Sequence, residues 1–121
     1  MCVTALAFFW HYNRFMIIVL LKINPQAGKR QDALDIFRSL ELPLQGQPDC
    51  LACEVYEAHE SEGEILYLEK WRNPEALNRH IQSPLYMRVL TAMELASKAP
   101  EIWFHKIADS RGMDLIEEVR S

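Results

Sequence analysis

The segment from residue 65 to residue 86 constrains the fold most, because a strand and two helix starts follow one another there. Residues 64–71 alternate in polarity as a half-buried strand does, which places Tyr67, Glu69 and Trp71 on one face. Asn73 is a favourable N-cap, and a proline directly after it loses no helical hydrogen bond. Ser83-Pro84 repeats this signal. The segment therefore predicts a strand followed by two helices.

The rest of the chain contains three further strand signals. Met16–Ile23 is a continuous β-branched run, typical of a strand buried on both faces. Residues 50–59 alternate in polarity, and the Ser61-Glu62-Gly63 turn predicts an antiparallel hairpin with the following strand. Glu101–Ile107 predicts a last strand. Helical spacing of apolar residues predicts a helix over residues 29–40, and Pro43, Gly46 and Pro48 predict a loop of six to nine residues after it.

The resulting order, β-α-β-β-α-α-β, is that of a split βαβ unit. Right-handed crossovers then give an α+β, ferredoxin-like protomer: a four-stranded antiparallel sheet with helices on one face. The other face would present apolar residues that nothing in the chain covers, so we expect a homodimer in which two sheets face each other. We assign residues 16–108 to this domain and residues 109–121 to a tail with a short amphipathic helix.

Charge and hydropathy exclude several classes of partner. The formal net charge is −4 and no Lys/Arg cluster occurs, which argues against nucleic acid and anionic membrane surfaces. The apolar run at residues 2–10 is too short to span a bilayer, is followed by Arg14, and lacks the flanks of a signal peptide. We interpret residues 1–15 as lying outside the domain, either because Met16 is the natural start or because they form a poorly ordered arm. A third possibility is that they cover apolar surface on a neighbouring subunit.

The cysteines indicate a reducing compartment. Cys50 and Cys53 have CxxC spacing, but they fall in a strand pattern that would point them to opposite faces. A redox pair needs a helix start, and a zinc site needs further ligands at matched spacing. We therefore expect buried, reduced thiols and a cytoplasmic protein.

The motifs from Glu69 onward resemble those of the antibiotic biosynthesis monooxygenase (ABM) superfamily. They are E-x-W, a polar-Pro helix start, A-L-x-x-H, and S-P before an aromatic residue. The resemblance extends over residues 16–108, and also takes in Asn24-Pro25, Gly28 and the C-L-x-C-E-V-Y strand. One departure is Asp49, which stands where the family commonly has glycine.

Members of this superfamily are dimeric α/β barrels of ferredoxin-like protomers. The resemblance implies a cofactor-independent monooxygenase that oxidises a small aromatic or quinol-type substrate. The haem-degrading branch has asparagine, tryptophan and histidine at positions held here by Leu20 or Leu21, His80 and Leu90, so haem degradation is not implied. Two alternatives stay open: a non-catalytic dimeric barrel that binds a small apolar ligand, and an isomerase of the same family. An isomerase would need a cationic pocket, whereas Arg79 and Arg88 are expected to point outward.

His80 is the best candidate for a catalytic group, because an imidazole on an apolar helix stripe could take a proton from a phenol or quinol. In the alternative, it is a core histidine bonded to Glu69 or to a backbone carbonyl. Glu69 would orient His80 or pair with an arginine across the dimer. We expect no cofactor and no metal, since no motif for either occurs. The predicted pocket walls are Trp71, Tyr86, Trp103, Tyr56 and Leu90.

Overall fold

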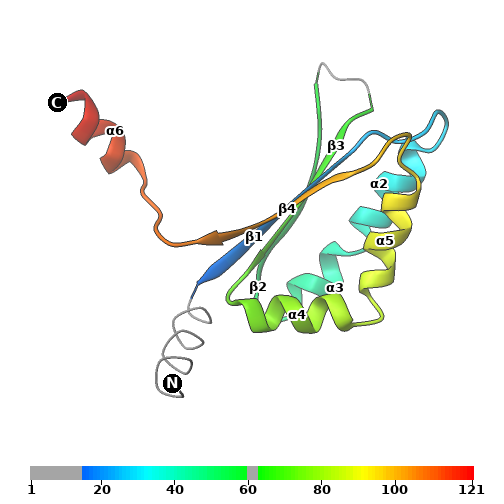
Figure 1. The fold of residues 1–121 in the computed structure, drawn as a ribbon, viewed down its shortest axis with the longest axis horizontal. Coiled ribbons are helices and arrows are strands. Elements are labelled where there is room, and N and C mark those ends of the chain that lie inside the picture. Colours follow the sequence, from blue (N-terminus) through cyan, green and yellow to red (C-terminus); the bar gives the residue numbers. More distant parts are fainter. Residues whose placement is uncertain (1–14, 60–62) are drawn as a thin grey trace, which may run out of the picture.

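The computed structural model describes residues 15–59 and 63–121. Expectations for residues 1–14 and for most of the turn at residues 61–63 therefore lie outside the described residues. The elements follow in the order β1 (Met16–Ile23), α2 (Arg30–Arg38), α3 (Glu41–Gln45), β2 (Cys50–Glu57), β3 (Ile65–Trp71), α4 (Pro74–Gln82), α5 (Tyr86–Glu94), β4 (Glu101–Ile107) and α6 (Met113–Arg120) (Figure 1).

The four strands form one sheet in the order β2-β3-β1-β4, and every neighbouring pair is antiparallel. Helices α2 to α5 all lie on one side of this sheet (Figure 1). This arrangement is the split βαβ topology. The ferredoxin-like α+β fold predicted from the sequence is therefore confirmed.

The core lies between the sheet and these helices. Alternate residues of β1 and β3 are buried there, as the period of two in a strand requires. From the helix side, Phe37 packs flat on Tyr67 with ring centroids 4.6 Å apart. The prediction that β1 is buried on both faces is wrong for the single chain. One face of the strand is buried against the helices, whereas the other face is only half-buried. The buried residues of the two strands are Ile17, Val19, Leu21, Ile23, Ile65, Tyr67, Glu69 and Trp71.

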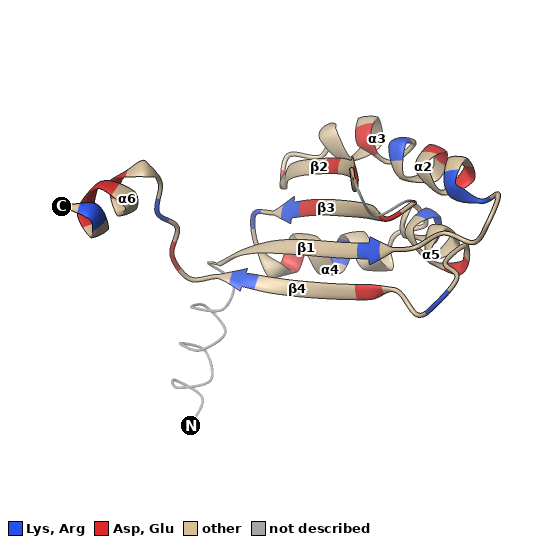
Figure 2. Cartoon of the chain, turned by 90° about the horizontal axis from the view of Figure 1, so that it is seen from above, with Lys and Arg blue, Asp and Glu red and all other residues tan. Residues whose placement is uncertain are grey.

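The opposite face of the sheet, which we call the open face, is apolar and has no helix over it within the described residues (Figure 1). Strand register places Leu20 opposite Leu68 on β3 and opposite Trp103 on β4. Trp103 is 42% exposed. Helix α6 stands away from the body of the domain (Figure 2), and its apolar residues are exposed. Among the described residues, no helix combines the length and hydrophobicity needed to cross a bilayer.

The segment predicted as a loop after α2 contains the short helix α3. Pro43 falls in its first turn, where the missing amide hydrogen costs no helical hydrogen bond. Leu40 and Leu44 are both fully buried against the core. Burial of these two residues, one helical turn apart, explains why the helix forms despite its proline.

A β-bulge interrupts the pairing of β2 with β3. Cys50 lies opposite Trp71, whereas Ala52 lies opposite Lys70, so Leu51 is one extra residue on β2. Leu51 is 38% exposed. A single inserted residue reverses the faces of everything before it in the strand.

The bulge corrects the prediction for the two thiols. Cys50 shares the helix-covered face with Cys53, which pairs with Glu69, instead of pointing to the opposite face. Cys53 is 4% exposed, and Cys50 packs at the edge of the core. Both are free cysteines.

Candidate functional site

The site is built where β3 ends and α4 begins. The Asn73 side chain caps α4 by accepting a hydrogen bond from the Ala76 amide at 2.8 Å, and Pro74 follows at the first helical position. This start, as predicted, sets the phase of α4. His80 therefore faces the sheet and is 2% exposed, whereas the next residue, Ile81, is 38% exposed.

Glu69 is the centre of a buried hydrogen-bond network. Its Oε2 accepts from the Tyr67 hydroxyl at 2.6 Å and lies 3.0 Å from His80 Nε2. Its Oε1 accepts from Trp71 Nε1 at 2.9 Å. Glu69 is 1% exposed, so these three donors replace the water that a carboxylate otherwise needs.

The His80 ring is fixed on three sides. Trp71 stacks on it with centroids 4.8 Å apart, and Tyr86 meets it edge-on at 5.1 Å. Because a carboxylate only accepts, the bond to Glu69 places a hydrogen on Nε2, so in the neutral ring Nδ1 is the acceptor. Nδ1 is buried and has no hydrogen-bond partner in the described part of the chain. A buried polar atom without a partner is uncommon, and because Nδ1 is shielded from solvent, a ligand hydroxyl reaches it only when a neighbouring side chain moves.

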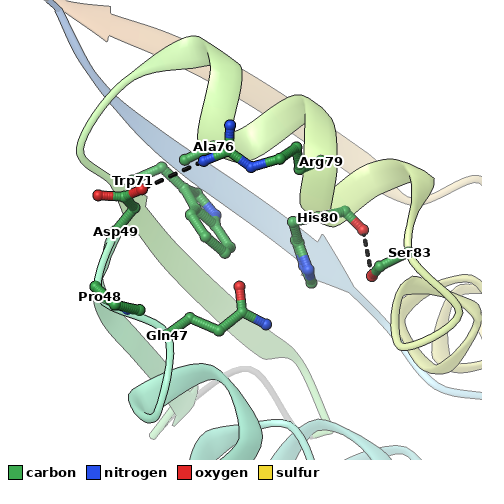
Figure 3. Close-up of a pocket in the computed structure, with 8 residues that line it drawn as sticks. All are labelled: Gln47, Pro48, Asp49, Trp71, Ala76, Arg79, His80 and Ser83. Carbon is green, nitrogen blue, oxygen red and sulfur yellow. Dashed lines mark hydrogen bonds and ion pairs between the residues drawn. The ribbon is translucent and has the colours of Figure 1, made fainter.

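A half-open pocket of about 330 Å³ lies beside this network (Figure 3). This volume is at the lower end of the roughly 300–1,000 Å³ typical of small-molecule sites. Trp71 forms its flat wall, and the segment between α3 and β2 closes the opposite side. The lining residues are Gln47, Pro48, Asp49, Trp71, Ala76, Arg79, His80 and Ser83.

Ion pairs surround the pocket mouth. Asp49 contacts both Arg72 and Arg79 at 3.3 Å, and Arg79 also contacts Glu75 at 3.2 Å. The positive charges of the two arginines are thus balanced by the negative charges of Asp49 and Glu75. Arg79 is exposed, as predicted. It also lines the pocket, which was not predicted. Asp49, noted above as a departure from the family pattern, ties the segment before β2 to the end of β3 and to α4.

Burial keeps the neighbouring hydroxyl and thiol groups protonated. Burial, and next the charge of Glu69, raise the pKa of Tyr67 and of Tyr86. Burial also raises the pKa of Cys50 to about 11 and that of Cys53 to about 12. These groups therefore serve as hydrogen-bond donors near neutral pH and not as bases or nucleophiles.

Three of the predicted pocket walls lie elsewhere, which corrects the prediction. Trp103 and Tyr56 are on the open face, because strand alternation puts them opposite Leu20 and Leu66 there. Leu90 is 41% exposed, since the buried stripe of α5 runs through Tyr86, Val89 and Ala92 instead. The residues that the structure does bring together are Glu69, Trp71, His80 and Tyr86.

Several residues of the site were missed from the sequence. Tyr67 could have been found, because its alternation with Glu69 and Trp71 places its hydroxyl on the same buried face. Gln47, Asp49 and Arg79 had no such signal, since they meet across the pocket only in the folded chain. The described residues include no group of three or more His, Cys, Asp or Glu side chains placed to bind a metal ion.

The sheet topology and the one-sided helical layer define a ferredoxin-like α+β domain with a pocket between sheet and helices. The family model for antibiotic biosynthesis monooxygenase matches residues 16–91, and the chain belongs to this family.

The chain is also similar to individual proteins. An uncharacterized protein of Synechocystis sp. is 28% identical over 96 residues, which are 78% of this chain and 65% of that protein, so the chain spans just under two thirds of its length. Among solved structures, Rv0793 from Mycobacterium tuberculosis matches with a TM-score of 0.72 at 20% identity, covering 80% of this chain and 99% of that one. A conserved protein from Methanosarcina mazei matches with a TM-score of 0.69 at 23% identity, covering 79% and 96%. These structural likenesses show the fold.

Proposed function

We propose that this chain is a cytoplasmic, cofactor-independent monooxygenase that oxidises a small aromatic or quinol-type substrate. The observation that carries the proposal is that His80 Nδ1 has no hydrogen-bond partner among the described residues and belongs to a residue that lines the pocket. Membership of the ABM family supports the same class of reaction.

In this mechanism the substrate lies against Trp71 and donates its hydroxyl hydrogen to His80 Nδ1. Glu69 stabilises the resulting imidazolium through Nε2, as the carboxylate does in other carboxylate–histidine pairs. The electron-rich substrate anion then reduces O₂. One oxygen atom bonds to a ring carbon, and the other leaves as water with two hydrogens from the substrate. The substrate supplies all four electrons, so a phenol becomes a quinone without an external reductant. Exclusion of water from the pocket favours transfer to O₂ over side reactions.

The test is oxygen uptake with reduced benzoquinones and naphthoquinones, without added flavin or metal and with the uncatalysed rate subtracted. His80→Ala removes the base and should lower the rate by about 10²- to 10⁴-fold. His59→Ala is the matched control, because His59 is exposed and lies outside the pocket. Full activity in His80→Ala would refute the proposed role.

We also propose that the chain acts as a homodimer through the open face. Leu20, Leu68 and Trp103 form an apolar row there that a second sheet would cover. Sedimentation at micromolar concentration should show a dimer. Replacement of Trp103 by Glu, which puts a charge into that row, should give the monomer, and a wild-type monomer would contradict the proposal.

A second candidate function is a non-catalytic barrel that binds a small apolar molecule. The 2% exposure of His80 favours it, because the ring is held like a core residue between Trp71 and Tyr86. Ligand binding without oxygen uptake would identify this function.

A further inference from the structure

Gln47 is a pocket residue whose side chain has no hydrogen-bond partner among the described residues. It lines the pocket opposite Trp71 and His80, and its amide group is directed toward these two rings (Figure 3). The side-chain amide forms no hydrogen bond with any other described residue, in contrast with Asp49 and Arg79, which pair with each other. Gln47 therefore has both a donor and an acceptor available in the pocket.

The backbone holds Gln47 in place. Its amide nitrogen donates to the Leu44 carbonyl at 3.0 Å, and its carbonyl accepts from the Cys50 amide at 3.1 Å. The segment is thus anchored to α3 on one side and to the first residue of β2 on the other. A side chain on a fixed backbone loses less entropy when it binds a ligand than one on a mobile loop.

The charged side chains around the pocket already form ion pairs with one another. Arg72 and Arg79 both contact Asp49, and Arg79 also contacts Glu75. An anionic ligand would have to compete with these carboxylates for a guanidinium group. The polar groups of the pocket without a partner among the described residues are His80 Nδ1 and the uncharged amide of Gln47.

We propose that Gln47 determines specificity by binding a second oxygen on the aromatic ring, on the far side from the hydroxyl that donates to His80. This inference rests on the proposed function and adds the residue that would select, within its substrate class, an uncharged arene with two oxygen substituents, such as a hydroquinone, over a ring with one. The Gln47 amide donates to that second oxygen or accepts from its hydroxyl. A ligand with one hydroxyl leaves the amide unpaired in the pocket, which weakens its binding.

The test measures binding and not turnover. Under argon, wild-type protein is titrated separately with hydroquinone and with 4-methylphenol, which has nearly the same shape but lacks the second oxygen. The readout is the NMR signal of the Trp71 indole N–H, since Trp71 forms the pocket wall. We expect hydroquinone to bind about 3- to 10-fold more tightly, the range for one neutral hydrogen bond.

Gln47→Leu should abolish this preference, because leucine has similar size and no polar group. Gln45→Leu is the matched control: Gln45 lies in the same segment, is exposed and is outside the pocket, so the preference should persist. An unchanged preference in Gln47→Leu, equal binding of both compounds to wild type, or binding of neither overturns the inference. Selective binding without oxygen uptake in air would instead refute the monooxygenase and leave the role of Gln47 standing.

Discussion

Replacing Glu69 by glutamine tests whether the buried carboxylate is held by three donors at once. Glutamine has the same shape but only one acceptor oxygen, and its amide nitrogen donates. If the carbonyl takes the Oε2 position, it keeps its bonds with Tyr67 and His80. The amide nitrogen then faces the Trp71 indole N–H across 2.9 Å, where two donors oppose each other.

The expected change in the free energy of unfolding follows from the hydrogen bonds that the substitution removes. One hydrogen bond to a charged acceptor is removed and one buried donor is left unpaired, which together lower the free energy of unfolding by about 2–4 kcal/mol. In a Trp71→Phe background the opposing donor is gone. The same Glu69→Gln change should then cost about 1–2 kcal/mol less, so the two substitutions are expected to be non-additive.

Urea unfolding followed by far-UV circular dichroism measures all four proteins of this cycle without relying on tryptophan fluorescence. Glu94→Gln is the control, because Glu94 is exposed and its side chain has no bond among the described residues; its effect should stay within about 0.5 kcal/mol. Equal costs of Glu69→Gln in both backgrounds, to within about 0.5 kcal/mol, would refute the three-donor arrangement.

Two further predictions concern stability. Asn73→Ala removes the cap of α4 and should cost about 1 kcal/mol more in urea unfolding than Asn78→Ala on the exposed face of the same helix; equal effects would contradict the capping role. The thiols predict a loss of stability at alkaline pH. The pKa of Cys53 rises from 9.0 to about 12 on folding, so its stabilising effect is complete below pH 9 and is lost as the unfolded thiol ionises above it. Between pH 8 and pH 10 this loss is about 1 kcal/mol, with a similar loss from Cys50; Cys53→Ala should show roughly half the wild-type slope, and an unchanged slope would contradict the assignment.

Local signals in the sequence sufficed for most of the fold. The Asn73-Pro74 start, the alternation of β3 and the positions of the four strands each depend on residues close together in the chain, and the structure confirms them; helix α3 was not predicted. The pairing of Glu69 with His80 was also predictable, since strand alternation and helix phase aim both side chains into the same layer.

The wall of the pocket that residues 47–49 form could not be predicted, because it depends on strand register and on contacts between residues distant in sequence. Polarity alternation does not show where an extra residue enters a strand, so Cys50 was placed on the wrong face. Asp49 and Arg79 are 30 residues apart, and only the folded chain brings them together. Trp103 and Leu90 lie on β4 and α5, which contribute no residue to the pocket lining.

The bulge at Leu51 makes β2 tolerant of a change in length. Deleting Leu51 would let β2 pair regularly with β3, and Cys50 would still lie opposite Trp71 on the helix-covered face. The segment before it, with Gln47 and Asp49, would therefore keep its side of the sheet. A one-residue insertion or deletion at this point of the strand is thus expected to leave both the fold and the pocket intact, so related chains can differ in length here.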